Sequence, residues 1–265
     1  MREVLDVMLS LPARVAALLL LLLLLLGLPN PPSPPVHVRG GGGPAVGGFC
    51  ARCAASPPRV EHLYLDLGAN RGNTIQLFLL DPAFTLAAAN NKDDFKFSYN
   101  PSDFRVVGVE AMRSTHGAAL EALQRRFPGQ VEIIWAAVGA GGGGMLRIYR
   151  DEGAAAEGEW GAGIQPRFSS KYEDVPTLDA SSWLANNTCA CDFVVVKCNI
   201  EGSEFALLDR MISEGTLCLM DVAHMYFHPQ FFQGRERELT ARIEEVYKPA
   251  FAACGVNAEV WSVHR

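Results

Sequence analysis

The chain has 265 residues, 49% of them hydrophobic, and a formal net charge of −6 at pH 7. That length and composition suffice for one sizeable core, so a single catalytic domain is the simplest organisation. The acidic balance, with no run of Lys or Arg interleaved with aromatic residues, argues against nucleic acid as a partner.

The amino terminus carries an almost purely aliphatic run, Val15 to Leu28, with Arg2 and Arg14 before it. A run of this length spans roughly 21 Å, less than the ~30 Å hydrocarbon core of a bilayer, which favours a signal peptide. The segment after it, residues 30–35, offers no Ala-x-Ala cleavage site, so an uncleaved signal anchor stays open. In either case we expect residues 1–28 to direct the chain into the secretory pathway. The rest is then secreted, or faces the ER or Golgi lumen as part of a single-pass membrane protein.

Residues 29–58 are rich in proline and glycine and are predicted to form a disordered stem, because they bury too little apolar surface to offset their ordering entropy. The folded domain is predicted over residues 59–265.

The sequence contains seven cysteines. In an oxidising lumen four of them are disulfide candidates: Cys50, Cys53, Cys189 and Cys191. Cys198 and Cys218 lie in apolar patterns that are typical of buried thiols. A zinc site built from the first four cysteines is a weaker alternative, because the Cys-x-Cys spacing does not suit a zinc knuckle, and we predict no metal.

From residue 60 onward, short apolar runs alternate with helical patterns, which is typical of a parallel sheet with helices on both faces. Strands are predicted at 63–67, 105–109, 131–138, 145–149, 193–198, 217–222 and 258–263. Helices are predicted at 74–80, 114–127, 203–212 and 233–253. The fold class is therefore α/β, with a Rossmann-like, mostly parallel, doubly wound sheet. The polar segment 81–103 is predicted to be an insertion that contacts substrate or a partner.

The stretch Leu63-Tyr-Leu-Asp-Leu-Gly-Ala-Asn-Arg-Gly-Asn-Thr74 runs from an apolar strand into a turn with glycines at 68 and 72. Open α/β sheets bind ligands at the carboxyl ends of their strands, and a glycine turn lets a ligand approach the backbone. We therefore predict a nucleotide-like cofactor over Asp66, Gly68, Asn70 and Gly72, and expect a bulkier residue at Gly68 to fill its space. The Gly-x-Asn-x-Gly spacing departs from the dinucleotide fingerprint, so a helix-entry turn without a ligand stays open.

Polar residues also lie at or beyond the ends of three other predicted strands. Glu110 ends the second strand, where a carboxylate can accept hydrogen bonds from ribose hydroxyls. Lys197, Asn199 and Glu201 alternate at the end of the strand 193–198, although Lys197 is also compatible with a surface lysine. Glu204 is expected to stabilise the first helical turn. At the end of the strand predicted at 217–222 and beyond it lie three further polar residues: Asp221, His224 and His228. Each histidine is a possible general base.

Five blocks together resemble the FkbM-type methyltransferases. They are Tyr64–Thr74, Val107-Gly-Val-Glu-Ala111, Trp135-Ala-Ala-Val-Gly139, Val175-Pro-Thr-Leu-Asp179 and Phe193-Val-Val-Val-Lys-Cys-Asn-Ile-Glu-Gly-Ser-Glu204, in that order over about 140 residues. The resemblance implies a class I fold that uses S-adenosyl-L-methionine and transfers a methyl group to a hydroxyl or carboxyl of a sugar or small metabolite. It implies that the residues 66, 68, 70 and 72 hold the methionine part, that Glu110 holds the ribose, and that Ala137 lies near the adenine.

The chain departs from the family pattern on the acceptor side. Where the family has the block Lys-Ile-Asp-Val-Glu-Gly, this chain has Asn199 in place of the aspartate, and asparagine cannot take a proton. The family also has a Glu-x-His pattern after the next strand. Tyr226-Phe-His228 matches it with tyrosine in place of the glutamate, and His224 is a second possible match for its histidine. We therefore expect His228 or Glu201 to act as the base, with Asn199 orienting a ligand. The alternatives are a methyltransferase-like binding protein without catalysis and an NAD-dependent oxidoreductase.

Overall fold

The computed structural model describes residues 50–55, 60–80, 99–139, 141–150, 163–164 and 171–262. The chain divides into two compact units, residues 1–35 with 98–100, and residues 36–97 with 101–265. Of the first unit only Tyr99 and Asn100 are described, so everything below concerns the second. The predicted signal peptide or anchor at 1–28 and most of the predicted insertion at 81–103 lie outside the described residues. Among the described residues, no helix combines the length and apolar character needed to cross a membrane.

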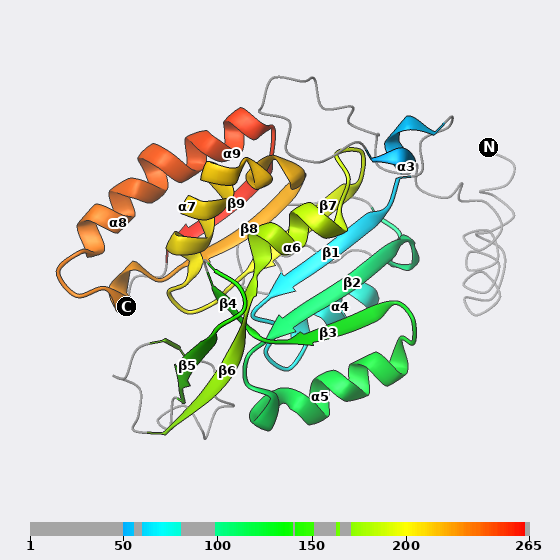
Figure 1. The fold of residues 1–265 in the computed structure, drawn as a ribbon, viewed down its shortest axis with the longest axis horizontal. Helices are drawn as coiled ribbons and strands as arrows, with labels where there is room; N and C mark the ends of the chain where they lie inside the picture. Colours follow the sequence, from blue (N-terminus) through cyan, green and yellow to red (C-terminus); the bar gives the residue numbers. More distant parts are fainter. Residues whose placement is uncertain are drawn as a thin grey trace, which may run out of the picture. The chain divides into compact units, whose positions relative to one another are not determined.

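The described part of the chain forms a six-stranded parallel sheet in the order β3-β2-β1-β7-β8-β9 (Figure 1). Its strands are β1 (His62–Leu67), β2 (Phe104–Glu110), β3 (Val131–Trp135), β7 (Phe193–Cys198), β8 (Val222–Phe227) and β9 (Asn257–Ser262). The chain leaves β1 toward one edge and returns to start β7 on the other side of β1. This is the doubly wound order, and it confirms the predicted Rossmann-like α/β fold.

Helices cover both faces of this sheet. One face packs on α6 (Ala180–Asn187), α7 (Glu204–Glu214), α8 (Glu236–Arg242) and α9 (Lys248–Cys254), in a core that includes Leu65, Val196 and Leu208. The other face packs on α4 (Asn73–Leu80) and α5 (Arg113–Arg126). There Phe78 of α4 stacks on Tyr64 with ring centroids 4.1 Å apart. Both faces are apolar because the strands are nearly continuous hydrophobic runs, as expected of a buried parallel sheet.

A smaller sheet with the order β4-β6-β5 adjoins the main one; its strands are β4 (Ala137–Gly139), β5 (Met145–Tyr149) and β6 (Tyr172–Asp179). The prediction of one strand over 131–138 is therefore wrong. Ala136 N–H donates to Glu110 O, where β3 ends, and the chain then pairs with β6 instead of β2. The strand β6 and the helix α6 were not predicted.

Two further predictions are corrected. The predicted strand 217–222 is a 3-10 helix, η3 (Thr216–Leu219), and the strand begins only at Val222. Gly215 ends α7 in the left-handed conformation, so Leu217 and Leu219 reach the core from a helical turn. The predicted helix 233–253 is α8, a π-helical turn η5 (Ile243–Tyr247) and α9 in succession. The described residues also include two short 3-10 helices, η2 (Pro101–Asp103) and η4 (Pro229–Phe231).

Three disulfides tie distant parts of the unit together. Cys50–Cys189 and Cys53–Cys191 join α3 (Ala51–Ala54), inside the predicted stem, to the turn after α6. These four cysteines are the disulfide candidates of the sequence. The sulfur atoms of Cys50, Cys53 and Cys189 lie within 4.8 Å of one another. In the structure Cys50 is bonded to Cys189, and Cys53 is bonded to Cys191.

The third disulfide joins Cys218 to Cys254. The prediction of a buried thiol at Cys218 is therefore wrong, because the 3-10 helix η3 brings this residue next to the end of α9. Cys198 is a buried free thiol, as predicted.

Candidate functional site

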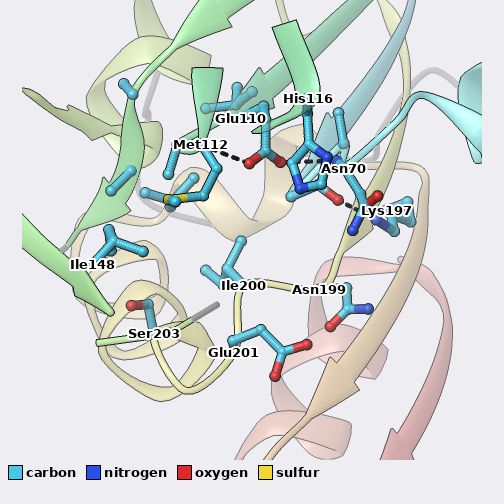
Figure 2. Close-up of a pocket in the computed structure, with 18 of the residues that line it drawn as sticks. Asn70, Glu110, Met112, His116, Ile148, Lys197, Asn199, Ile200, Glu201 and Ser203 are labelled. Carbon is cyan, nitrogen blue, oxygen red and sulfur yellow. Dashed lines mark hydrogen bonds between the residues drawn. The ribbon is translucent and has the colours of Figure 1, made fainter. Parts of the chain in front are cut away.

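A cavity of about 320 Å³ opens at the carboxyl edge of the central sheet. In the register of the strands, Leu67 of β1 pairs with Val109 of β2 and with Cys198 of β7, so the three strands end at the same level. The turns that follow these strands supply its walls. Figure 2 shows Glu110 and Asn70 on one side of this cavity, Asn199 and Glu201 on another, and Ile200 between them.

The turn after β1 is held by contacts within the protein. Gly68 has φ +82°, and a Cβ atom there would lie 1.9 Å from the backbone oxygen of Asn199. Gly72 has φ +79°, and a Cβ there would lie 2.8 Å from Leu123 of α5. Gly68 lines the cavity, whereas Gly72 packs on α5 and is not among the residues that line it. A side chain at Gly68 would thus collide with the backbone of Asn199 in the neighbouring turn. The structure gives this collision, and not the expected filling of the cofactor's space, as the reason for a glycine at position 68.

A buried ion pair lies beneath this turn. Asp66 is fully buried, and its Oδ1 lies 2.9 Å from Nζ of Lys197 in the adjacent strand. Lys197 Nζ also donates to the Gly68 carbonyl at 2.7 Å, and Thr74 Oγ1 donates to the second oxygen of Asp66. Lys197 is therefore a buried residue and not a surface lysine. It lines the cavity, whereas Asp66 does not, so Asp66 acts on the site through Lys197 and the turn.

Glu110 joins two walls of the cavity. Its Oε2 accepts the N–H of Asn70 at 2.8 Å, and its Oε1 accepts the N–H of Met112 at 2.8 Å. Burial raises the pKa of the Glu110 carboxyl, and the two backbone donors and Lys197 act in the opposite direction. Each carboxylate oxygen has a second lone pair, so Glu110 can still accept two hydrogen bonds from a ligand.

One end of the cavity is apolar. The predicted residue Ala137 lies in a small hydrophobic cluster with Met112, Ile148 and Val175, and Leu146 and Ile164 pack against it. All of these except Val175 line the cavity, together with Ala136 and Val138. Met112 directly follows the Glu110 turn, so the carboxylate stands between this apolar end and the turn after β1. A flat apolar ring with a polar group attached fits such an end.

The other end is polar, and it contains an unsatisfied acceptor. Asn199 lines the cavity, and its buried Oδ1 has no hydrogen-bond partner within the described ranges. A buried carbonyl oxygen without a donor costs about 1–3 kcal/mol, so such atoms commonly mark a place where a ligand or water donates. The Asn199 backbone N–H donates to Leu67 O, which fixes this residue beside the β1 turn.

His228 lies behind the cavity wall and is not among the residues that line it. Its Nδ1 lies 3.0 Å from Oε1 of Glu204, and its Nε2 lies 3.7 Å from Oε2 of Glu201. Its ring stacks on Phe231 with centroids 5.0 Å apart. Glu201 does line the cavity, so of the two predicted bases only Glu201 faces a ligand there.

Glu204 does more than stabilise the first turn of α7. It is fully buried, and its oxygens accept the N–H groups of Ile200 at 3.0 Å and Gly202 at 2.8 Å. The same carboxylate contacts His228. Glu204 therefore fixes the turn that carries Glu201, which itself has φ +52°, and it orients the His228 ring.

The sequence suggested that His224 follows a strand, but the structure places it in the middle of β8. It is fully buried, and desolvation lowers its pKa to about 4. Its Nδ1 lies 3.3 Å from Oε2 of Glu259, whose pKa burial raises to about 7. Asp221 precedes β8, where its side chain accepts the N–H of Val194 at 2.8 Å. Neither residue reaches the cavity, whereas Tyr226, which the sequence did not single out as a site residue, does.

The structure thus brings six of the predicted residues to one cavity: Gly68, Asn70, Glu110, Ala137, Asn199 and Glu201. It places Asp66, Gly72 and His228 in supporting positions outside its lining. The apolar residues Ile148 of β5 and Ile164 carry no signal in the sequence, because they reach the edge only through contacts of β5: β5 pairs with β6, and its Tyr149 pairs with Gly163, next to Ile164. No protein-family model, no curated protein and no solved structure matches this chain.

Proposed function

We propose that the chain is an S-adenosyl-L-methionine-dependent methyltransferase of the FkbM type, which methylates an oxygen of a sugar or other small metabolite. The observation that carries the proposal is one cavity in which an apolar end, the Glu110 carboxylate and a polar end with an unsatisfied acceptor are continuous. These three environments match the adenine, the ribose diol and the charged amino-acid part of this cofactor.

The residues fit the parts of the cofactor by their chemistry. The cluster around Met112, Ala137 and Ile148 would pack on adenine. Glu110 would accept the two ribose hydroxyls with its remaining lone pairs. At the polar end, Asn199 Oδ1 would accept an ammonium N–H, and Lys197 would donate its remaining proton to the carboxylate. The cofactor supplies an electrophilic methyl group on a positively charged sulfur.

The turn after β1 favours this cofactor over a dinucleotide. In the dinucleotide fingerprint the second glycine lets the pyrophosphate approach the backbone closely. Here Asn70 occupies that position, two residues after Gly68, and its side chain accepts the N–H of Arg71 at 2.7 Å. The backbone is therefore covered where a pyrophosphate would lie.

On the acceptor side, Glu201 is the group that would take a proton from an acceptor hydroxyl, because it lines the cavity and carries a carboxylate. His228 would support it from behind, held by Glu204. Asn199 cannot accept a proton, so its part is to position a ligand. An acceptor carboxylate would need no proton removal at all.

We further propose a luminal or secreted location, reached through residues 1–28, either as a soluble chain or as a single-pass membrane protein. The three disulfides support an oxidising compartment. The partner is then a small-molecule or glycan acceptor of that compartment, and not a nucleic acid.

Isothermal titration of the purified chain with S-adenosylhomocysteine and with NAD tests the cofactor. We expect S-adenosylhomocysteine to bind and NAD not to bind. Glu110→Gln should weaken the S-adenosylhomocysteine affinity by roughly tenfold to a hundredfold, because it removes charge-assisted hydrogen bonds. The matched control is Glu132→Gln, which changes an exposed glutamate of the neighbouring strand β3 that pairs with Arg105 of β2. Preferred binding of NAD, or equal loss in both variants, would refute the cofactor assignment.

The alternative is a methyltransferase-like binding protein that keeps the cofactor and lacks catalysis, and the replacement of the family aspartate by Asn199 favours it. Methyl transfer to a panel of hydroxyl and carboxyl acceptors decides between the two. Cofactor binding without transfer in the natural chain and in Asn199→Asp would favour the binding protein.

A further inference from the structure

A second cavity, of about 370 Å³, adjoins the first. The two cavities share Leu146, Ile164 and Ser203 as lining residues. Ser203 comes two residues after Glu201, so the second cavity begins next to the proposed base. A molecule that presents an oxygen to Glu201 can therefore extend into the second cavity.

The walls of the second cavity combine aromatic rings with positive charge. Phe205, Phe232 and Tyr247 supply the rings, which contact one another edge-on or tilted, and Leu239 adds an aliphatic surface. Two guanidinium groups, from Arg235 and Arg242, line the cavity against one carboxylate, Asp209. The lining therefore carries a net positive charge in a chain whose net charge is −6.

The carboxylate is already committed to its neighbours. Asp209 Oδ1 accepts Nη2 of Arg242 at 2.6 Å and the hydroxyl of Tyr247 at 2.8 Å. The Nε of Arg242 is buried and has no hydrogen-bond partner in the described parts of the chain. A buried donor of a charged group without an acceptor is unfavourable, so an oxyanion beside Arg242 would satisfy it.

Within the described part of the chain, the guanidinium of Arg235 contacts one carboxylate, that of Glu238, which is itself exposed. Its Nε and Nη2 contact both carboxylate oxygens of Glu238 at 3.0 and 2.7 Å, and the two side chains are 55% and 57% exposed. The pair is bidentate, but both side chains are exposed to solvent, so a ligand anion can reach the guanidinium and compete with Glu238 for it.

We propose that the second cavity is the acceptor subsite and that the acceptor is a hydroxy acid: a ring-bearing molecule whose carboxylate binds Arg242 and Arg235 while its hydroxyl faces Glu201. The ring would pack on Phe232, which is half-buried and lines the cavity. The placement of the hydroxyl rests on the proposed function, because it assumes that the methyl group is delivered in the first cavity. The anion site itself does not depend on that assumption.

Ligand-observed NMR titration of the purified chain with 4-hydroxybenzoate and with its neutral analogue 4-hydroxybenzamide tests the proposal. The titration is run with and without saturating S-adenosylhomocysteine. We expect the acid to bind at least tenfold more tightly than the amide. Arg242→Gln and Arg235→Gln should each reduce this preference severalfold or more without changing the affinity for the amide. Arg237→Gln, a control that removes an exposed arginine of α8 outside the cavity lining, should leave the preference unchanged.

Equal affinity for acid and amide, binding of neither probe, or a preference that survives in both Arg242→Gln and Arg235→Gln would overturn the proposal. Because Arg235 is exposed, its variant also keeps the test valid if Arg242→Gln fails to fold. Failure of the proposed function gives a different result. In that case S-adenosylhomocysteine does not bind, while the arginine-dependent preference for the acid persists.

Discussion

The paired disulfides at α3 give a worked prediction about stability. Cys50–Cys189 and Cys53–Cys191 have sequence separations of 139 and 138 residues, so both close the same long loop. Chain-entropy estimates assign about 5 kcal/mol to closing a loop of that length. Once one bond is present, the other closes a ring of only about half a dozen residues, which is worth about 2 kcal/mol. Either bond alone therefore keeps the long loop closed, and most of the stabilisation is lost only when both bonds are removed.

The perturbation is the removal of each bond by replacing both of its cysteines with alanine. We expect the Cys50/Cys189 variant and the Cys53/Cys191 variant each to lose about 2 kcal/mol of unfolding free energy, and the quadruple variant to lose about 7 kcal/mol. The two changes are then non-additive by about 3 kcal/mol. Removal of Cys218–Cys254, whose separation is 36 residues, is the control. It should cost about 4 kcal/mol and add to either single change.

The assay is equilibrium denaturation in guanidinium chloride without reductant, followed by tryptophan fluorescence, with the slopes compared to check that the same transition is measured. Additive losses for Cys50–Cys189 and Cys53–Cys191 would refute the reasoning, because they would mean that the two bonds do not close a common loop. No loss in the quadruple variant would show that α3 is not tied to the domain.

Three further predictions concern the carboxylates of Glu204, Glu110 and Glu259. Glu204→Gln should lower the unfolding free energy by about 1–3 kcal/mol, because the amide group of glutamine cannot accept both backbone N–H groups. The variant should also reduce turnover, while its affinity for S-adenosylhomocysteine stays within a few fold of the natural chain. Unchanged turnover would show that Glu204 does not act on the site. Because burial raises the pKa of Glu110, its carboxylate becomes protonated as the pH falls below that raised pKa. The affinity of the natural chain for S-adenosylhomocysteine should therefore fall over this pH range, whereas the affinity of Glu110→Gln should not. Titrations at several pH values measure this difference. The pKa of Glu259 is raised to about 7, so its contribution to stability is lost as the pH rises from about 4.5 through 7. Glu259→Gln should therefore be the more stable form at pH 8 and similar at pH 4, and the opposite order in thermal unfolding would contradict this sign.

Much of the central sheet follows from local sequence. The strands β1, β2 and β7 are apolar runs that end in turns, and the sequence locates the end of each, together with Glu110 and the glycine turn after β1. These features are local, because a strand that is buried on both faces needs apolar residues at every position.

The rest depends on contacts between distant residues. The strand β8 contains His224, which reads as polar in the sequence but is buried among neighbouring strands, whereas the apolar residues of η3 reach the core from a helical turn. The second sheet exists only because β6 pairs with both β4 and β5. Likewise, the sequence named both His228 and Glu201 as candidates for the base. Only the fold shows that Glu204 holds His228 behind the wall while Glu201 faces the cavity.

A crystal structure of the chain with S-adenosylhomocysteine tests the central claim most directly. We expect the adenine against Met112 and Ile148, the ribose hydroxyls on Glu110, and a ligand N–H on Oδ1 of Asn199. A ligand that binds elsewhere, or one that leaves Glu110 and Asn199 without contacts, would contradict the account.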